Sequence, residues 1–91
     1  MSEFRKRPVV IDAIQLGRSP QSLHDVLEFI GSSKPYVVQD EANDTHAIVI
    51  PTLAEGSLRV SVGDWVIRDE HGAVHPCKPD IFAATYEAVN E

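Results

Sequence analysis

The chain has 91 residues, of which 43% are hydrophobic and 24% charged, and its formal net charge is −6 at pH 7. The length suits a single small domain spanning residues 1–91, and the composition excludes an intrinsically disordered chain. The acidic balance has the wrong sign for general binding to nucleic-acid backbones, but it does not exclude a compact anionic ligand.

A strand and a helix are predicted in the first third of the chain. Residues 8–16 present apolar side chains on both alternating faces, which predicts a strand covered on both sides at the centre of a sheet. Residues 20–30 carry one apolar stripe at helical spacing, made by Leu23, Val26, Leu27 and Ile30. Ser19 is the expected N-cap, with Pro20 at the first helical position and Gly31 as the C-terminal cap.

Three short strands are predicted in the middle of the chain, at residues 36–39, 46–52 and 58–62. Residues 40–44 between them are acidic and polar, so we expect this segment to be exposed. Pro51 lacks the N–H of a ladder hydrogen bond, which indicates that its end of the strand lies at a sheet edge or a bulge.

A hairpin is predicted next. Residues 65–68 and 73–75 form its strands, and residues 69–72 form its loop, with glycine where a positive φ is needed. The preceding Gly63-Asp64 pair is expected to make a tight turn.

The C-terminal residues are predicted to close the sheet. Pro76 and Pro79 favour an extended, non-helical passage between them. Asp80 is expected to cap one short turn over residues 81–83, and residues 85–89 are expected to form a closing strand. The whole pattern predicts an α+β domain, with one helix packed on a curved, mostly antiparallel sheet of about five to seven short strands. Such a sheet could curl into a partly open small barrel.

The C-terminal third, LRVSVGDWVIRDEHGAVHPCKPDIFAATYEAV over residues 58–89, resembles a PGDYG-like family of small proteins found widely in phages and prophages. That family has a Gly-Asp-aromatic turn, a Pro-Cys-Lys-Pro-Asp-Ile-Phe stretch and a Thr-Tyr-Glu ending. Its basic start, leading into a strand, matches residues 5–14. His75 stands where the family often has an aromatic residue, and Val62 where it often has proline. The resemblance implies a phage or prophage setting and a similar shape, without implying a particular chemistry.

Cysteine usage and targeting signals predict a cytoplasmic location. The lone Cys77 cannot form an intramolecular disulfide, and the first residues lack the apolar stretch of a signal peptide. No run approaches the roughly 20 apolar residues of a membrane span, so we predict no membrane partner. The basic residues 5–7 are interpreted as a solvated segment that protects a sheet edge.

Five residues near the C-terminal strands are candidate contacts for a ligand or a partner. If the last strands curl, Arg68 and Lys78 would hold a phosphate or carboxylate beside a stacking aromatic ring. Trp65 alone could also stack on a base or anchor a partner protein. The competing interpretation is that Arg68 and Lys78 are solvated charges at strand edges. The candidate set is Trp65, Arg68, His75, Lys78 and Tyr86.

Other residues are predicted to be structural. Gly63 permits a tight turn, Asp64 can accept backbone N–H bonds, and Trp65 can equally supply core contacts. Cys77 is expected to be buried, because free cysteines usually are, and Asp80 is expected to cap its turn.

Metal and nucleophile signals are weak. His71, His75 and Cys77 form an H-x3-H-x-C pattern without an evident fourth zinc ligand. His75 and Lys78 could activate the Cys77 thiol, but the pattern is equally that of a structural cysteine. We therefore predict no metal, no cofactor and no catalytic residue.

Three functions are considered on this basis. The leading hypothesis is a phage- or prophage-type accessory protein that binds a host protein or itself, through strand edges or its acidic surface. The first alternative is a binder or sponge for a nucleotide-like signal that counters host defence, which requires Arg68, Lys78 and an aromatic ring around one pocket. The second alternative is a minimal enzyme that uses Cys77 or a His/Cys metal centre.

Overall fold

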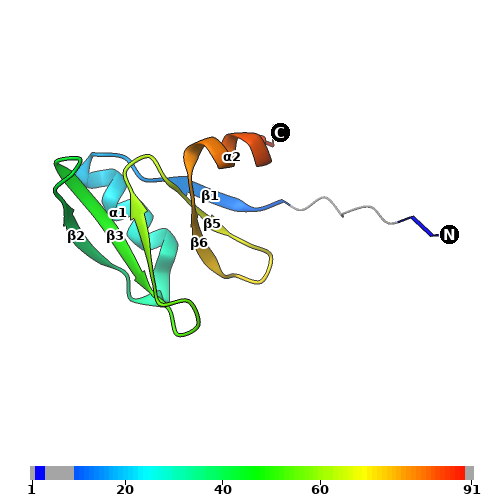
Figure 1. Cartoon of the computed structure of the whole chain (residues 1–91), viewed down its shortest axis with the longest axis horizontal. Helices are drawn as coiled ribbons and strands as arrows, with labels where there is room; N and C mark the ends of the chain where they lie inside the picture. Colours follow the sequence, from blue (N-terminus) through cyan, green and yellow to red (C-terminus); the bar gives the residue numbers. More distant parts are fainter. Residues whose placement is uncertain (1, 4–9, 90–91) are drawn as a thin grey trace.

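The computed structural model describes residues 2–3 and 10–89, which form two antiparallel three-stranded sheets and two helices (Figure 1). The sheet orders are β1-β5-β6 and β2-β3-β4. The α+β class predicted from the sequence is confirmed, although two sheets replace the single curved sheet and a second helix is present. In chain order the elements are β1 (Asp12–Gln15), α1 (Pro20–Ile30), the 3-10 turn η1 (Gly31–Ser33), β2 (Tyr36–Asp40), β3 (Thr45–Pro51), β4 (Ser57–Ser61), β5 (Trp65–Arg68), β6 (Val74–Cys77) and α2 (Pro79–Thr85).

The two sheets do not close into a barrel. β4 and β6 lie close together, but within the described residues no ladder of hydrogen bonds joins them. The expected curl toward a barrel therefore stops at two separate sheets. Within the same residues, no helix is long and apolar enough to span a bilayer.

Helix α1 has the bounds and caps that the sequence predicts. The Ser19 hydroxyl accepts the N–H of Ser22 at 3.0 Å, and Pro20 occupies the first turn, where a missing N–H costs no hydrogen bond. Gly31 follows the last helical residue with φ of 72°, a value that favours glycine, and donates its N–H to the carbonyl of Leu27. Local signals alone are thus sufficient to define this helix.

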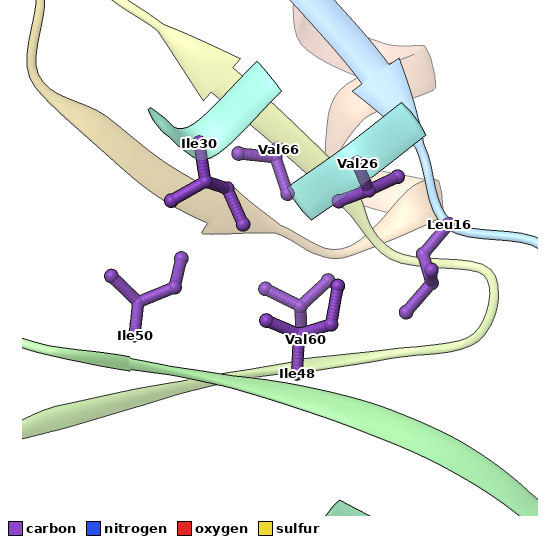
Figure 2. Close-up of a cluster of buried hydrophobic side chains, with 7 residues drawn as sticks. All are labelled: Leu16, Val26, Ile30, Ile48, Ile50, Val60 and Val66. Carbon is purple, nitrogen blue, oxygen red and sulfur yellow. The ribbon is translucent and has the colours of Figure 1, made fainter. Parts of the chain in front are cut away.

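The core lies between α1 and the sheet β2-β3-β4, and β5 adds to it from the second sheet (Figure 2). Its members are almost inaccessible to solvent, so each contributes the full free energy of apolar burial, about 1.5–3 kcal/mol per large side chain. Figure 2 shows the α1 side chains directed toward those of β3 and β4. The buried cluster consists of Leu16, Val26, Ile30, Ile48, Ile50, Val60 and Val66.

Strand β1 lies at an edge of its sheet, which corrects the central position expected from its sequence. It pairs with β5 alone in the described part of the chain, and it begins at Asp12, later than predicted. Its two faces are both apolar: Ile14 packs against the core, and Ala13 lies on the other face opposite Ile67. Coverage of both faces does not give a strand two neighbours. Residues 8–9 and the basic residues 5–7 lie outside the described residues.

The sheet β2-β3-β4 closely follows the predicted strands. β3 is its central strand, and β2 begins opposite Val49, so Pro51 has a neighbour on the β4 side only. The missing N–H of Pro51 therefore costs no ladder bond. This agrees with the edge position that the proline indicated.

Asp40, at the end of β2, is buried and not exposed as predicted. Its exposed fraction is 4%, and its carboxylate accepts a hydrogen bond from the Asn43 side chain at 3.0 Å and lies 3.7 Å from the Arg59 guanidinium. The Asn43 hydrogen bond lowers the pKa of Asp40 below its ordinary value, against the opposing effect of burial, and the charge of Arg59 adds to the lowering. Asn43 of the acidic turn thus binds the Asp40 carboxylate at the start of that turn, which composition alone does not reveal.

The C-terminal residues form helix α2 in place of the expected turn and closing strand. Pro79 occupies the first turn and Lys78 is the N-cap, so Asp80 lies within the first turn and does not cap it. Residues 86–89 are not in a strand. The extended passage predicted between Pro76 and Pro79 is confirmed, because Cys77 ends β6 and Lys78 is extended with φ of -66° and ψ of 147°. The first-turn proline, the acidic Asp80 and the two alanines that follow favour a helix from Pro79 onward.

Candidate functional site

Strand β5 separates two of the predicted contact residues onto opposite faces. Trp65 lies opposite Gln15 and Cys77, whereas Arg68 lies opposite Asp12 and Val74. Side chains alternate along a strand, so positions three apart point to opposite faces. The structure therefore does not bring Trp65 and Arg68 into one site.

Trp65 is stacked against Phe82, an aromatic residue of α2. Its ring stacks on Phe82 with centroids 4.0 Å apart and planes 4° apart, and Phe82 contacts Tyr86 at 5.2 Å. Trp65 and Tyr86 thus belong to one aromatic row, with Phe82 between them. Phe82 was not predicted as part of the site. The signal that could have found it is the helix-start pattern at Pro79, which places Phe82 one turn after the N-cap Lys78.

Lys78 joins this region through Asp64 of the preceding turn. Its Nζ lies 3.2 Å from Asp64 Oδ2, and the buried Asp64 carboxylate also accepts the N–H of Ser61 at 2.9 Å. Gly63 adopts φ of 99° and donates its N–H to the carbonyl of Leu16 at 2.8 Å. The Gly63-Asp64 turn thereby fixes β4, the end of β1 and the start of α2 to one another.

Arg68 is engaged at the other end of β5. Its guanidinium lies 4.1 Å above the Phe29 ring, donates a hydrogen bond to the Phe29 carbonyl, and lies 3.9 Å from Asp12. The Phe29 carbonyl belongs to the last turn of α1, where no later helical N–H can reach it. Arg68 therefore ties the end of α1 to the sheet.

His75 and Cys77 lie on the Trp65 face of β6. His75 is exposed opposite Ile67, and Cys77 is half-buried opposite Trp65, which corrects the full burial expected for this cysteine. The Cys77 thiol lies 3.6 Å from the Lys78 carbonyl, and no hydrogen bond joins it to His75 in the described residues. A thiol without a base at hydrogen-bonding distance does not form a nucleophilic pair.

The histidine-rich hairpin loop is organised by Asp69. Partial burial raises the pKa of Asp69, but the N–H groups of His71 and Ala73 and the nearby charges of His75 and His71 outweigh it, so the pKa lies below its ordinary value. His71 is exposed. Among the residues that the structure describes, no three His, Cys, Asp or Glu side chains converge as a metal site would require.

The predicted contact residues thus occupy separate places. Trp65, Lys78 and Tyr86 lie around α2, His75 extends from the same face into solvent, and Arg68 lies on the opposite face against α1. A small anionic ligand would need Arg68, Lys78 and an aromatic ring around one pocket, and the described residues do not assemble that pocket.

Among the described residues, the most open sheet edge is that of β2, which forms one margin of the molecule in Figure 1. Within the described residues β2 pairs only with β3. Tyr36 and Val37 are 50% and 45% exposed there, so an aromatic and a β-branched side chain adjoin an unpaired backbone. Exposed edges of this kind accept additional strands.

The backbone groups available on β2 follow from the ladder register. Thr52, which continues β3, donates its N–H to the Gly56 carbonyl on the β4 side at 3.0 Å. Successive strand residues direct their backbone groups to opposite sides, so the odd-numbered residues of β3 face β2. Those residues pair with the even-numbered residues of β2. The N–H and C=O groups of Val37 and Gln39 therefore point outward.

The edges of β4 and β6 are each partly closed. On β4, Ser61 donates its N–H to Asp64 Oδ2 at 2.9 Å and accepts the Asp64 N–H at 2.9 Å, so the outward groups of Ser61 are already paired. Ser57 and Arg59 also face outward, and β6 lies close to this strand. On β6, the hydrogen bond from the Asp69 N–H to the Ala73 carbonyl shows that the odd-numbered residues face β5. Pro76 therefore faces outward, and proline has no N–H to donate. Neither edge presents a complete row of donors and acceptors.

The edge of β1 is a weaker competitor. The bond from the Leu16 N–H to the Asp64 carbonyl makes Ala13 and Gln15 the outward residues of β1. This strand is only four residues long. Of its two outward residues, Ala13 has only a methyl group, and the Gln15 side-chain amide already donates to the Gly63 carbonyl. The β2 edge is longer and more apolar.

Comparison with known proteins finds no matching family model, no matching curated protein and no matching solved structure. The resemblance of residues 58–89 to a phage and prophage family therefore stays a prediction. The geometry of the chain itself is the basis for the function proposed below.

Proposed function

We propose that this chain is a binding module that acts by pairing its β2 edge with an extended strand of a partner, and not by catalysis. The observation that carries the proposal is the unpaired backbone of Val37 and Gln39 beside the exposed Tyr36 side chain. Main-chain hydrogen bonds would supply affinity in such a complex, and the alternating side chains would supply selectivity. The partner class is a host protein or a further copy of this chain.

The setting we propose is that of a phage- or prophage-type accessory protein in the host cytoplasm. The motif likeness of residues 58–89 supports this setting, and the small size of the chain is compatible with it. The C-terminal third that carries the motifs includes Asp64, Trp65 and Lys78, which hold the turn and α2 in place. The open edge of β2 lies outside these residues, so the motif-bearing third would serve as a scaffold for it.

The decisive experiment uses Val37→Pro. This substitution removes one outward N–H while leaving the β2–β3 ladder intact, because Val37 directs its backbone away from β3. The tagged wild-type chain and the variant are compared for the bacterial proteins they retain and for self-association by sedimentation. We expect the wild type either to retain at least one specific bacterial protein or to associate with further copies of itself. Val37→Pro should lose that interaction.

Ala13→Pro is the matched control, since it removes an outward N–H from the other open edge, on β1. Circular dichroism establishes that both variants are folded. If Val37→Pro binds every partner as the wild type does, or if Ala13→Pro alone abolishes binding, the β2 edge is not the binding surface.

A further inference from the structure

We propose that the strand that pairs with β2 is β2 of a second copy, in an antiparallel arrangement with Val38 facing itself across a two-fold axis. This inference rests on the proposed function and names its partner. It predicts a symmetric dimer whose two β2-β3-β4 sheets join into one continuous sheet.

The hydrogen-bonding pattern of the edge is complementary to itself in this register. Two-fold symmetry about Val38 places Val37 opposite Gln39 of the second copy, and Gln39 opposite its Val37. These are the residues whose N–H and C=O groups point outward, so each outward donor meets an outward acceptor. Val38, which bonds inward to β3, lies at the axis, where no interchain backbone bond is required.

Neighbouring symmetric registers are poorer. A shift in one direction places Gln39 opposite Pro35, which has no N–H to donate. A shift in the other direction places Val37 opposite Glu41, which lies in the turn beyond the end of β2. Of these three registers, the one centred on Val38 is the one in which every hydrogen-bonding residue lies in β2 and has both an N–H and a C=O group.

The charges at the two ends of β2 also favour antiparallel pairing with itself. Lys34 precedes the strand and Glu41 follows it, and both are exposed. Antiparallel pairing brings the lysine end of one copy beside the glutamate end of the other, whereas parallel pairing would place like charges together. The pairing also covers Tyr36 and Val37, the two most exposed large apolar side chains of the sheet's strands.

The edge is short, so the dimer should be weak and concentration-dependent, in the range of small transient interfaces. Analytical ultracentrifugation over a dilution series reaching about 1 mM tests it, a range that includes the weakest specific complexes. We expect the wild type and Ala13→Pro to dimerise with similar dissociation constants. We expect Val37→Pro to raise the dissociation constant about tenfold or more, because symmetry removes an N–H donor from each copy.

Cysteine cross-linking tests the register. In a Cys77→Ser background, Val38→Cys should form a disulfide-linked dimer under mild oxidation, because the two introduced thiols face each other across the axis. Val37→Cys is the matched control: its two copies are displaced along the strands beyond the roughly 7 Å Cα separation that a disulfide tolerates. Equal cross-linking of both variants, or cross-linking of Val37→Cys alone, would overturn the register.

A wild-type chain that stays monomeric to the highest concentration overturns the self-pairing. If such a chain still retains a foreign protein that Val37→Pro loses, the proposed binding function stands and its partner is of another sequence. If neither self-association nor capture depends on Val37, both proposals fail together.

Discussion

The two helices of this small domain differ in how they are held. α1 has 11 residues and buries Val26 and Ile30 completely or nearly so, whereas α2 has seven residues and none of them is buried. α2 is attached mainly by the stack of Phe82 on Trp65 and by the contact of Lys78 with Asp64. Stability should therefore be concentrated in the layer of α1 and the sheet β2-β3-β4, and α2 should open locally before the domain unfolds.

The largest expected effect is in the α1 layer. Ile48 is fully buried beneath α1, so Ile48→Ala should lower the free energy of unfolding by about 2–5 kcal/mol, through lost burial and the cavity left behind. Urea denaturation followed by circular dichroism measures this loss. Ile81→Ala is the matched control on α2, where the side chain is 56% exposed, and it should change the free energy by less than about 0.5 kcal/mol. Similar losses in the two variants would contradict the division between the helices.

A smaller and local effect is expected at the stack. Phe82→Ala removes the ring that covers Trp65 and should cost about 1–2 kcal/mol, from the aromatic pair and its half-buried area. Amide hydrogen exchange should show lost protection over α2 while the β3 amides keep theirs, and Trp65 fluorescence should shift to the red. If protection falls equally in α2 and β3, α2 is part of the cooperative core and the comparison fails.

The same division separates what the sequence could predict from what it could not. α1 was predicted with its bounds because the Ser19 cap, Pro20, the apolar stripe and Gly31 all act within one segment. The strands of the sheet β2-β3-β4 were predicted within a residue or two by their alternation. α2 was predicted only as one short turn, because Pro79 was interpreted as the end of an extended passage and not also as the first residue of a helix.

The candidate site shows a different kind of limit. That Trp65 and Arg68 lie on opposite faces follows from their spacing of three along a strand, and the sequence contained this information. The contacts that engage them were not predictable, because Phe29 approaches Arg68 and Phe82 approaches Trp65 from other elements. The open edge of β2 required knowledge of strand order, since a sequence shows which residues form a strand and does not show which strands lack a neighbour.

The smallest expected effect is a pH-dependent change in stability at a buried carboxylate. Among the described residues, two carboxylates are buried, Asp40 in the sheet β2-β3-β4 and Asp64 beside the sheet β1-β5-β6. The pKa of Asp40 is lowered by the Asn43 side chain and by Arg59. A carboxyl with a lowered native pKa stabilises the fold above the unfolded-state pKa, near pH 4, and this contribution is lost as the pH falls through the native value.

Asp40→Asn should therefore be less stable than the wild type at pH 6, and the difference should shrink as the pH falls below about 4, because protonation then neutralises Asp40 in the wild type as well. The substituted amide retains an oxygen that can accept the Asn43 hydrogen bond, so the lost term is the charge interaction with Arg59 and the charge-assisted part of that bond. Urea midpoints measured at each pH, at protein concentrations low enough to keep the chain monomeric, give the difference directly. Glu41→Gln removes an exposed charge from the same turn and controls for net charge. A gap between wild type and Asp40→Asn that is constant from pH 6 to pH 2 would show that the charge of Asp40 contributes nothing to the stability of the fold.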